Sequence, residues 1–119
     1  MSRTDLRERT KAFALRTIKL AGALPMGRAG DVIGKQLLKS GTSIGANWRE
    51  ACRASSKRHF VTTAETCLRE ADETLYWLEL LSESNLVKAA RLAAILDECN
   101  QLVAILVSTV KHAKGGPKG

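Results

Sequence analysis

The sequence predicts an all-α protein that folds as an antiparallel, up-down four-helix bundle. Three observations lead to this prediction. Apolar residues recur at steps of three and four in four successive blocks, which is the period of an α-helix. The prolines, Pro25 and Pro117, lie outside these blocks. The connections between the blocks are short, which is typical of antiparallel neighbours in a bundle.

The first two helices are predicted on either side of Pro25, because proline disfavours helical geometry in the residue before it. One face of the first helix is formed by Leu6, Thr10, Phe13, Thr17, Leu20 and Leu24. The second uses Ile33, Leu37, Gly41, Ile44, Trp48 and Ala51. Either Ser55 or Ser56 is then suited to cap the third helix.

The third helix is predicted to end at the turn sequence SESN, residues 82–85. Its core positions are Phe60, Ala64, Cys67, Ala71, Leu75, Leu78 and Leu81. The fourth uses Leu92, Ile95, Cys99, Leu102, Leu106 and Val110, and four further apolar residues widen this stripe. Because one neighbouring face needs less width, we expect the fourth helix to be central or to touch another subunit.

One domain is expected from the length of 119 residues, enough to bury about two-thirds of the unfolded surface. We assign residues 1–113 to the bundle and residues 114–119 to a flexible basic C-terminal tail. The three cysteines are odd in number and lack a CxxC pair, so we expect free thiols rather than a disulfide framework or a zinc site.

Small residues dominate the second helix between Lys39 and Glu50, in the stretch KSGTSIGANWRE. Gly41 and Gly45 are four residues apart and share a face. Each glycine costs about 1 kcal/mol relative to alanine inside a helix, so close approach of another helix is the expected compensation. A phosphate-binding loop is disfavoured, because a Walker motif needs Lys directly after its second glycine and Gly45 precedes Ala46.

Polar residues form a second line on this helix: Ser43, Asn47 and Glu50. A bundle is tightly packed here, so we expect these side chains to hydrogen-bond a neighbouring helix or its backbone. The five residues Gly41, Ser43, Gly45, Asn47 and Glu50 are thus predicted to form a helix-packing motif.

The pattern Ser43, Gly45, Ala46, Asn47 and Glu50, with EADETLYWLELL downstream, resembles the bacterial "four helix bundle protein" family. That family is associated with open reading frames inside intervening sequences of 23S ribosomal RNA genes. It is similar in fold to the accessory variability protein of diversity-generating retroelements, a basic pentameric barrel that binds nucleic acid and a reverse transcriptase. The resemblance implies a homo-oligomer, a pentamer, with an RNA-handling protein such as a reverse transcriptase as a further partner. The family has no settled activity.

Positive charge is concentrated in the first half of the chain. Residues 1–60 carry 13 Lys/Arg and 4 Asp/Glu, whereas residues 61–119 carry 6 and 8. On the second helix four cations share a face: Lys35, Lys39, Arg49 and Arg53. Lys57 and Arg58 extend the charge, and the first helix adds Arg9, Arg16 and Lys19. These nine residues are the predicted nucleic-acid-binding residues, since such lines of cations can follow a phosphate backbone.

Two other interpretations of the basic face remain open. In the first, the basic face is simply a solvated helix face. In the second, it meets an acidic face on the third helix, which carries Glu65, Asp72, Glu79 and Glu83. The hypothesis is therefore a non-enzymatic, oligomeric protein that binds RNA or DNA without strong sequence preference. The alternative is a protein-interaction or accessory subunit that does not bind nucleic acid itself.

Catalytic and metal sites are not expected. A di-iron bundle needs Glu-x-x-His on two helices, and the only histidines, His59 and His112, do not follow a glutamate at this spacing. We therefore predict no enzyme activity, no cofactor and no metal ion. Trp48 and Trp77 are expected to be core or interface anchors rather than base-stacking platforms.

A cytoplasmic location without membrane insertion is expected. The N-terminal sequence MSRTDLRERT is charged and no apolar segment follows it, so a signal peptide is not predicted. The most apolar segment, residues 86–110, contains Lys88, Arg91, Asp97 and Glu98, which are costly inside a bilayer.

Overall fold

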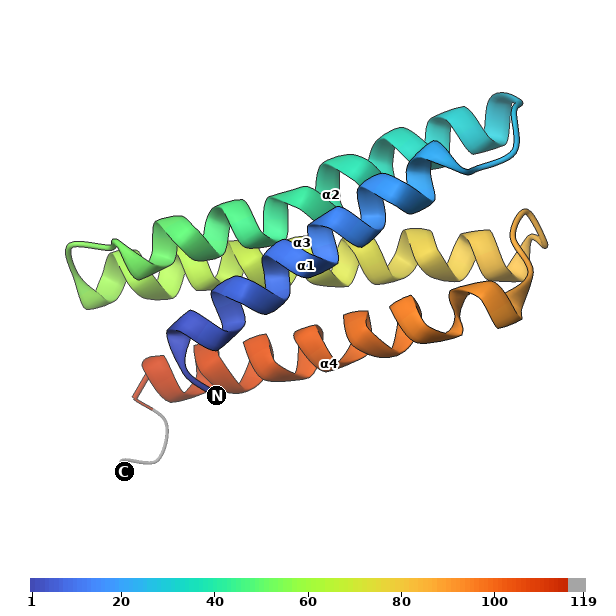
Figure 1. The fold of residues 1–119 in the computed structure, drawn as a ribbon. Helices are drawn as coiled ribbons and strands as arrows, with labels where there is room; N and C mark the ends of the chain where they lie inside the picture. The colour runs from blue at the N-terminus through green and yellow to red at the C-terminus, as the bar shows by residue number, and fades with distance from the viewer. Residues whose placement is uncertain (116–119) are drawn as a thin grey trace.

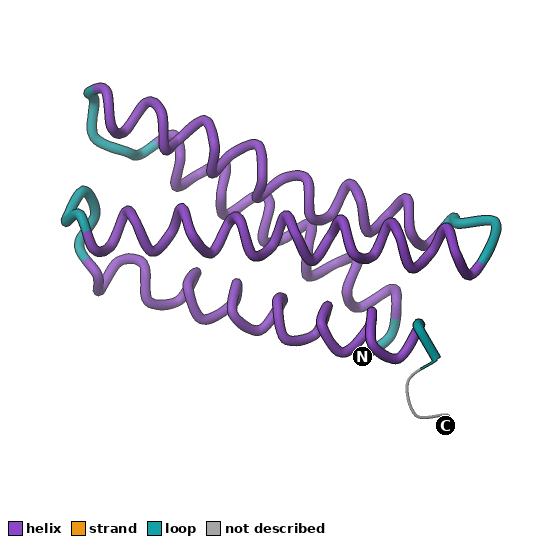
Figure 2. The backbone as a smooth tube through the Cα atoms, turned by 180° about the vertical axis from the view of Figure 1, so that it is seen from behind, coloured by secondary structure: helices purple, strands orange, loops and turns teal. Residues whose placement is uncertain are grey.

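The computed structural model describes residues 1–115 and contains four helices. They are α1 (Arg3–Gly22), α2 (Arg28–Cys52), α3 (Lys57–Glu83) and α4 (Ala89–Ala113). Successive helices run in opposite directions and are joined by short turns, giving a bundle of 48 × 23 × 20 Å (Figures 1 and 2). The predicted all-α, up-down four-helix bundle is confirmed. Residues 116–119 of the predicted tail lie outside the described residues.

The helix ends form where the sequence supplies capping residues. Ser2 and Asp5 make a reciprocal capping box at the start of α1. Ser56 caps α3, because its side chain accepts a hydrogen bond of 3.0 Å from the backbone N–H of His59. After α3 ends, Asn85 adopts a φ of 64°, a left-handed conformation that asparagine tolerates better than most residues. The turn predicted at residues 82–85 therefore lies at the observed end of the helix.

The helices do not pack evenly around the bundle. α1 packs along α2, α2 along α3, and α3 along α4, but α1 and α4 meet over a much shorter stretch. Figure 1 shows the reason, since α1 crosses the bundle diagonally from the C-terminal half of α4 towards the N-terminal half of α2. The faces of α1 and α4 that do not meet are left open to solvent or to a partner.

The core is built from the predicted helical faces. Its largest fully buried apolar side chains are Trp48, Phe13, Leu37, Ile44, Leu78, Leu81, Leu92, Leu102 and Leu106. One polar pair joins two helices inside this core, because the hydroxyls of Ser40 on α2 and Thr74 on α3 lie 2.8 Å apart. A buried hydroxyl needs such a partner, so this pair tolerates burial without an unsatisfied group.

α4 lies at the edge of the bundle rather than at its centre. Its wide apolar stripe extends beyond the contact with α3, so that Val103 and Ile105 are half-buried and Val107 is exposed. By length and composition alone, with a mean hydropathy of 1.4 over an 18-residue window, α4 could cross a membrane. A core helix of a soluble protein passes the same criterion. Part of the apolar stripe of α4 is therefore open to solvent.

Candidate nucleic-acid interface

α1 and α2 approach each other closely along a row of small residues on α2. A Cβ atom placed on Gly41 would lie 2.7 Å from Cγ2 of Thr17, and one on Gly45 would lie 3.2 Å from Oγ1 of Thr10. The first distance is shorter than any normal carbon–carbon contact. The two glycines therefore let the threonine face of α1 pack directly on the backbone of α2.

A shallow hollow of about 340 Å³ lies beside this contact. Its floor is made of small residues, Ala14, Gly45 and Ala46. Four longer side chains surround the floor, and we call this site the basic groove: Arg7 and Lys11 from α1, and Thr42 and Arg49 from α2. The groove exists because the close helix contact lowers its floor while the long side chains rise on both sides.

The basic groove is positive because three of its lining residues, Arg7, Lys11 and Arg49, are cations and none is acidic. Among the described residues, Arg7, Lys11 and Arg49 form no ion pair within 4 Å. Their charges are therefore available to a ligand. A phosphate group can approach the small-residue floor closely while three cations surround it, an arrangement that suits a nucleic-acid backbone.

The cations predicted on α2 lie at different places on the surface. Arg49 lines the basic groove, whereas Lys35 lines a separate hollow of about 450 Å³ next to the α1–α2 turn. The remaining predicted cations on α2 and at the start of α3 are exposed: Lys39, Arg53, Lys57 and Arg58. The predicted stripe is thus one surface of α2, and its middle part borders the groove.

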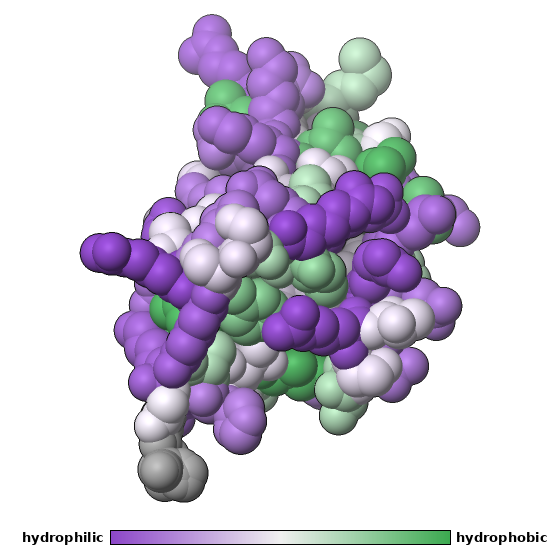
Figure 3. Space-filling view, turned by 90° about the vertical axis from the view of Figure 1, so that its left-hand side faces the viewer, coloured by the Kyte–Doolittle hydropathy of each residue, from purple (hydrophilic) through white to green (hydrophobic). Residues whose placement is uncertain are grey.

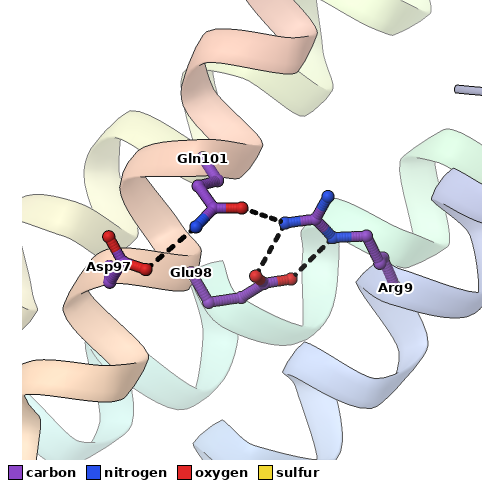
Figure 4. A network of polar contacts seen from close by, with 4 residues as sticks. All are labelled: Arg9, Asp97, Glu98 and Gln101. Carbon is purple, nitrogen blue, oxygen red and sulfur yellow. Dashed lines mark hydrogen bonds and ion pairs between the residues drawn. The ribbon is translucent and has the colours of Figure 1, made fainter.

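Arg9, a predicted binding residue, is engaged within the fold. Its guanidinium donates two hydrogen bonds to the Glu98 carboxylate, at 2.9 and 2.7 Å, and a third to Gln101 Oε1 at 2.8 Å (Figure 4). The hydrogen bonds to Glu98 raise the pKa of Arg9 above its ordinary value. A bidentate pair of this kind fixes geometry, so Arg9 ties α1 to α4 where the two helices meet.

The other predicted cations of α1 lie away from the basic groove. Arg16 follows Arg9 by two helical turns, so it shares the face of α1 that is directed to α4. Lys19 is exposed. Instead, α1 contributes Arg7 and Lys11, which the sequence analysis did not select. Their spacing of four residues was visible, but the sequence did not reveal which face of the first helix meets the second.

The polar residues of α2 differ from the prediction. Ser43 donates a hydrogen bond of 2.6 Å to the backbone carbonyl of Lys39, and Asn47 donates one of 2.9 Å to that of Ser43. The expected bonds to a neighbouring helix are therefore not formed by these two side chains, because a carbonyl one turn earlier on the same helix is nearer. Glu50 does reach another helix, 3.5 Å from Nε2 of His59.

The acidic residues of α3 do not neutralise the predicted cations of α2. Among the described residues, the α3 ion pairs join Lys114 to Glu65 at 2.6 Å and His59 to Glu50. Burial raises the pKa of Glu70 above its ordinary value, and the charge of Lys39 opposes this shift at longer range. Within one subunit, the positive and negative faces thus remain largely separate.

The described residues contain no group of three His, Cys, Asp or Glu side chains that could hold a metal ion. Burial raises the pKa of both the Cys67 and the Cys99 thiols to about 12, so both stay protonated near neutral pH. Cys52, the third free thiol, is half-buried.

Comparison with known proteins identifies the family. The family model described as 23S rRNA-intervening sequence protein matches residues 3–108. The chain belongs to the 23S rRNA-intervening sequence protein family. A crystal structure of a protein of unknown function from the S23 ribosomal protein family of Bacteroides thetaiotaomicron is also similar. It is 35% identical, covers 93% of this chain and 99% of its own, and superposes with a TM-score of 0.86. No curated protein matches the chain.

This family membership confirms the predicted resemblance, and the matched residues span α1 to α3 and most of α4. The related structure is itself of unknown function, so the comparison establishes family and architecture.

Proposed function

We propose that this protein is a non-enzymatic, oligomeric family member that binds nucleic acid without strong sequence preference through the basic groove. The observation that supports this most strongly is the set of three cations around a small-residue floor, Arg7, Lys11 and Arg49, which form no ion pair with other described residues. Each phosphate that such a cation neutralises releases condensed counterions, and this release drives binding.

Contacts to the backbone rather than to bases are expected from the composition of the groove. Its lining contains no aromatic side chain on which a base could stack, and no Asn or Gln that could contact a base edge with two hydrogen bonds. Cations contacting phosphates position a nucleic acid but carry little sequence information. The family is named for 23S rRNA intervening sequences, which makes structured RNA the first ligand to test.

The test is binding of a labelled RNA hairpin between about 50 and 200 mM salt, a range in which phosphate contacts weaken strongly. We expect log Kd to rise steeply with log salt for the unmodified protein. The triple variant Arg7→Gln, Lys11→Gln, Arg49→Gln is expected to reduce the slope by about 3, since each lost phosphate contact removes about one unit.

A matched control removes the same charge elsewhere. The variant Lys88→Gln, Arg91→Gln, Lys111→Gln loses three exposed cations of the α4 region and leaves the groove intact. It should keep most of the salt slope. Equal effects of the two triple variants would show that net charge, not the groove, drives binding, and absence of binding at the lowest salt would reject the function.

Self-assembly is the second part of the proposal, and exposed apolar side chains support it. Leu15 and Ile18 on α1 and Leu38 on α2 are between 39 and 59% exposed, and we call these three residues the apolar patch. Tyr76 on α3 is also 53% exposed. Ile18 and Leu38 line the same hollow next to the α1–α2 turn, and exposed apolar residues often mark an interface between proteins.

Charge complementarity suggests how the copies meet. The apolar patch lies on the basic half of the bundle, near Lys35 and Lys39, whereas α3 exposes Tyr76 together with Asp72 and Glu79. Contact of the α1–α2 face of one copy with the α3–α4 face of the next is head-to-tail. Such contacts close into a ring when the rotation permits, and the pentamer implied by the family resemblance is one such ring. The basic groove lies towards the other half of α1 and remains outside this contact.

Sedimentation velocity tests the assembly. We expect the unmodified protein to sediment as an oligomer and Ile18→Asp to shift it to the monomer, because a charge would then be buried in an apolar contact. Ala12→Asp is the control, since Ala12 is exposed on the same helix but is not part of the apolar patch. A monomeric unmodified protein, or dissociation by both variants alike, would contradict the proposed interface.

A further inference from the structure

A large hollow lies at the end of the bundle where the α2–α3 turn is found. It has a volume of about 880 Å³ and is lined by residues from all four helices and this turn. We call it the end pocket, and its defining residues are Ala51, Phe60 and Ile105 on the floor and Arg3, Lys57 and His112 on the rim. Its volume is that of a typical site for a small organic molecule.

The pocket is a consequence of how α1 enters the bundle. α1 crosses diagonally and leaves the last turns of α4 partly uncovered, and the adjoining side chains, Ala51, Ala54 and Ala104, are too small to fill the space. Figure 3 faces this end of the molecule and shows white and green residues surrounded by hydrophilic purple ones. The pocket therefore combines an apolar floor with a polar rim.

The rim residue Arg3 is held in place on both its main chain and its side chain. The indole Nε1 of Trp48 donates a hydrogen bond of 3.1 Å to the Arg3 carbonyl oxygen. The Arg3 guanidinium lies 4.4 Å from the ring centre of Phe60, a cation–π contact. Phe60 is itself fixed by an edge-to-face contact with Trp48, at 5.8 Å between ring centres. A flat cationic surface is thus preorganised above an aromatic ring.

The electrostatics of the pocket are set by its side chains. None of its lining residues is acidic, and among the described residues neither Arg3 nor Lys57 forms an ion pair within 4 Å. Two helix N-termini and two helix C-termini meet at this end, so the helix dipoles largely cancel. The two cations and the imidazole of His112 are left to interact with a ligand, and the hydroxyls of Ser55 and Ser108 add further donors.

From this combination we infer that the end pocket binds a small organic anion with a flat apolar body, such as an aromatic carboxylate or sulfonate. The apolar body would lie on Ala104 and Ile105, beside the Arg3–Phe60 contact, while the anionic group would face Arg3 and Lys57. An inorganic anion would leave the apolar floor exposed to water, and a cation would be repelled by the rim. The site lies apart from the basic groove, since the two share no lining residue.

The probe is anilinonaphthalene sulfonate (ANS), which combines an aromatic body with one negative charge and fluoresces when it leaves water. We expect saturable binding to one site per chain on the folded protein, monitored at the same time by circular dichroism. Naphthoate should displace ANS, whereas the uncharged naphthalene methanol should displace it much less. Equal displacement by both would show that the cationic rim does not contribute, and absence of saturable binding would reject the site.

Variants locate the binding on the molecule. Arg3→Gln and Lys57→Gln are each expected to raise the Kd for ANS about fivefold, as loss of one exposed charge pair does. Ser108→Phe places a large side chain in the hollow from an exposed position and should abolish binding without disturbing the core. Lys111→Gln is the matched control, because Lys111 is exposed near the pocket but does not line it. Unchanged binding in Ser108→Phe would overturn the assignment.

Discussion

Replacing Gly41 with leucine is expected to lower the free energy of unfolding by more than about 2 kcal/mol, because overpacking a tight contact forces the helices apart. Already the first atom of the new side chain would lie 2.7 to 3.0 Å from three atoms of Thr17. α1 would have to move off α2 to make room, and the basic groove beside this contact would change with it. Urea unfolding followed by circular dichroism at 222 nm, a standard helix signal, measures the loss.

Alanine substitutions at three glycines provide the controls for this prediction. Gly45→Ala meets Thr10 only at 3.2 Å or more, and Gly22→Ala meets nothing within 4 Å. We therefore expect Gly41→Ala to destabilise most, Gly45→Ala less, and Gly22→Ala to be neutral or stabilising, since alanine favours a helix over glycine by about 1 kcal/mol. A stable Gly41→Leu protein, or the reverse order among the alanines, would contradict the close α1–α2 contact.

The fold could be predicted from the sequence because its determinants are local. The period of three and four identified each helix, and Pro25 and Ser56 placed two of the breaks. Hydrophobic faces of this kind specify a bundle without knowledge of the distances between helices. The confirmed fold class therefore follows from information that each segment carries alone.

The candidate site could be predicted only in part, because it depends on how two helices cross. Arg49 was found since it belongs to a stripe within one helix. Arg7 and Lys11 were missed, and Arg9 was selected although Glu98 binds it, because the diagonal course of α1 decides which side faces α2. The nearest sequence signal is the pair of glycines, which indicates a close contact but not the helix that makes it.

The hydrogen-bond partners of the polar residues on α2 could not be predicted from the sequence either. The sequence indicated polar residues on the second helix but not their partners, and Ser40 with Thr74 makes the cross-helix contact instead of Ser43 or Asn47. A hydroxyl on a helix can bond either a carbonyl of its own helix or a neighbour, and only the packing distance decides between them.

Truncation of Trp48, which is fully buried, is expected to have a large effect on stability. Trp48→Ala should lower the free energy of unfolding by about 3 to 5 kcal/mol, the range for removal of a buried large aromatic side chain. Trp48 is 1% exposed, packs edge-to-face on Phe60, and holds the first turn of α1 through the Arg3 carbonyl. Urea unfolding, compared with the unmodified protein under the same conditions, gives the value.

The two tryptophans allow the hydrogen bond to be separated from the packing. Trp48→Phe removes the indole N–H that binds Arg3, whereas the Nε1 of Trp77 is buried without a hydrogen-bond partner among the described residues. Trp77→Phe would delete an unsatisfied donor and thereby offset part of its lost packing. We therefore expect Trp48→Phe to destabilise more than Trp77→Phe, by about 1 kcal/mol. If the two cost the same, the bond to Arg3 does not hold α1, and the end pocket loses the anchor of its rim.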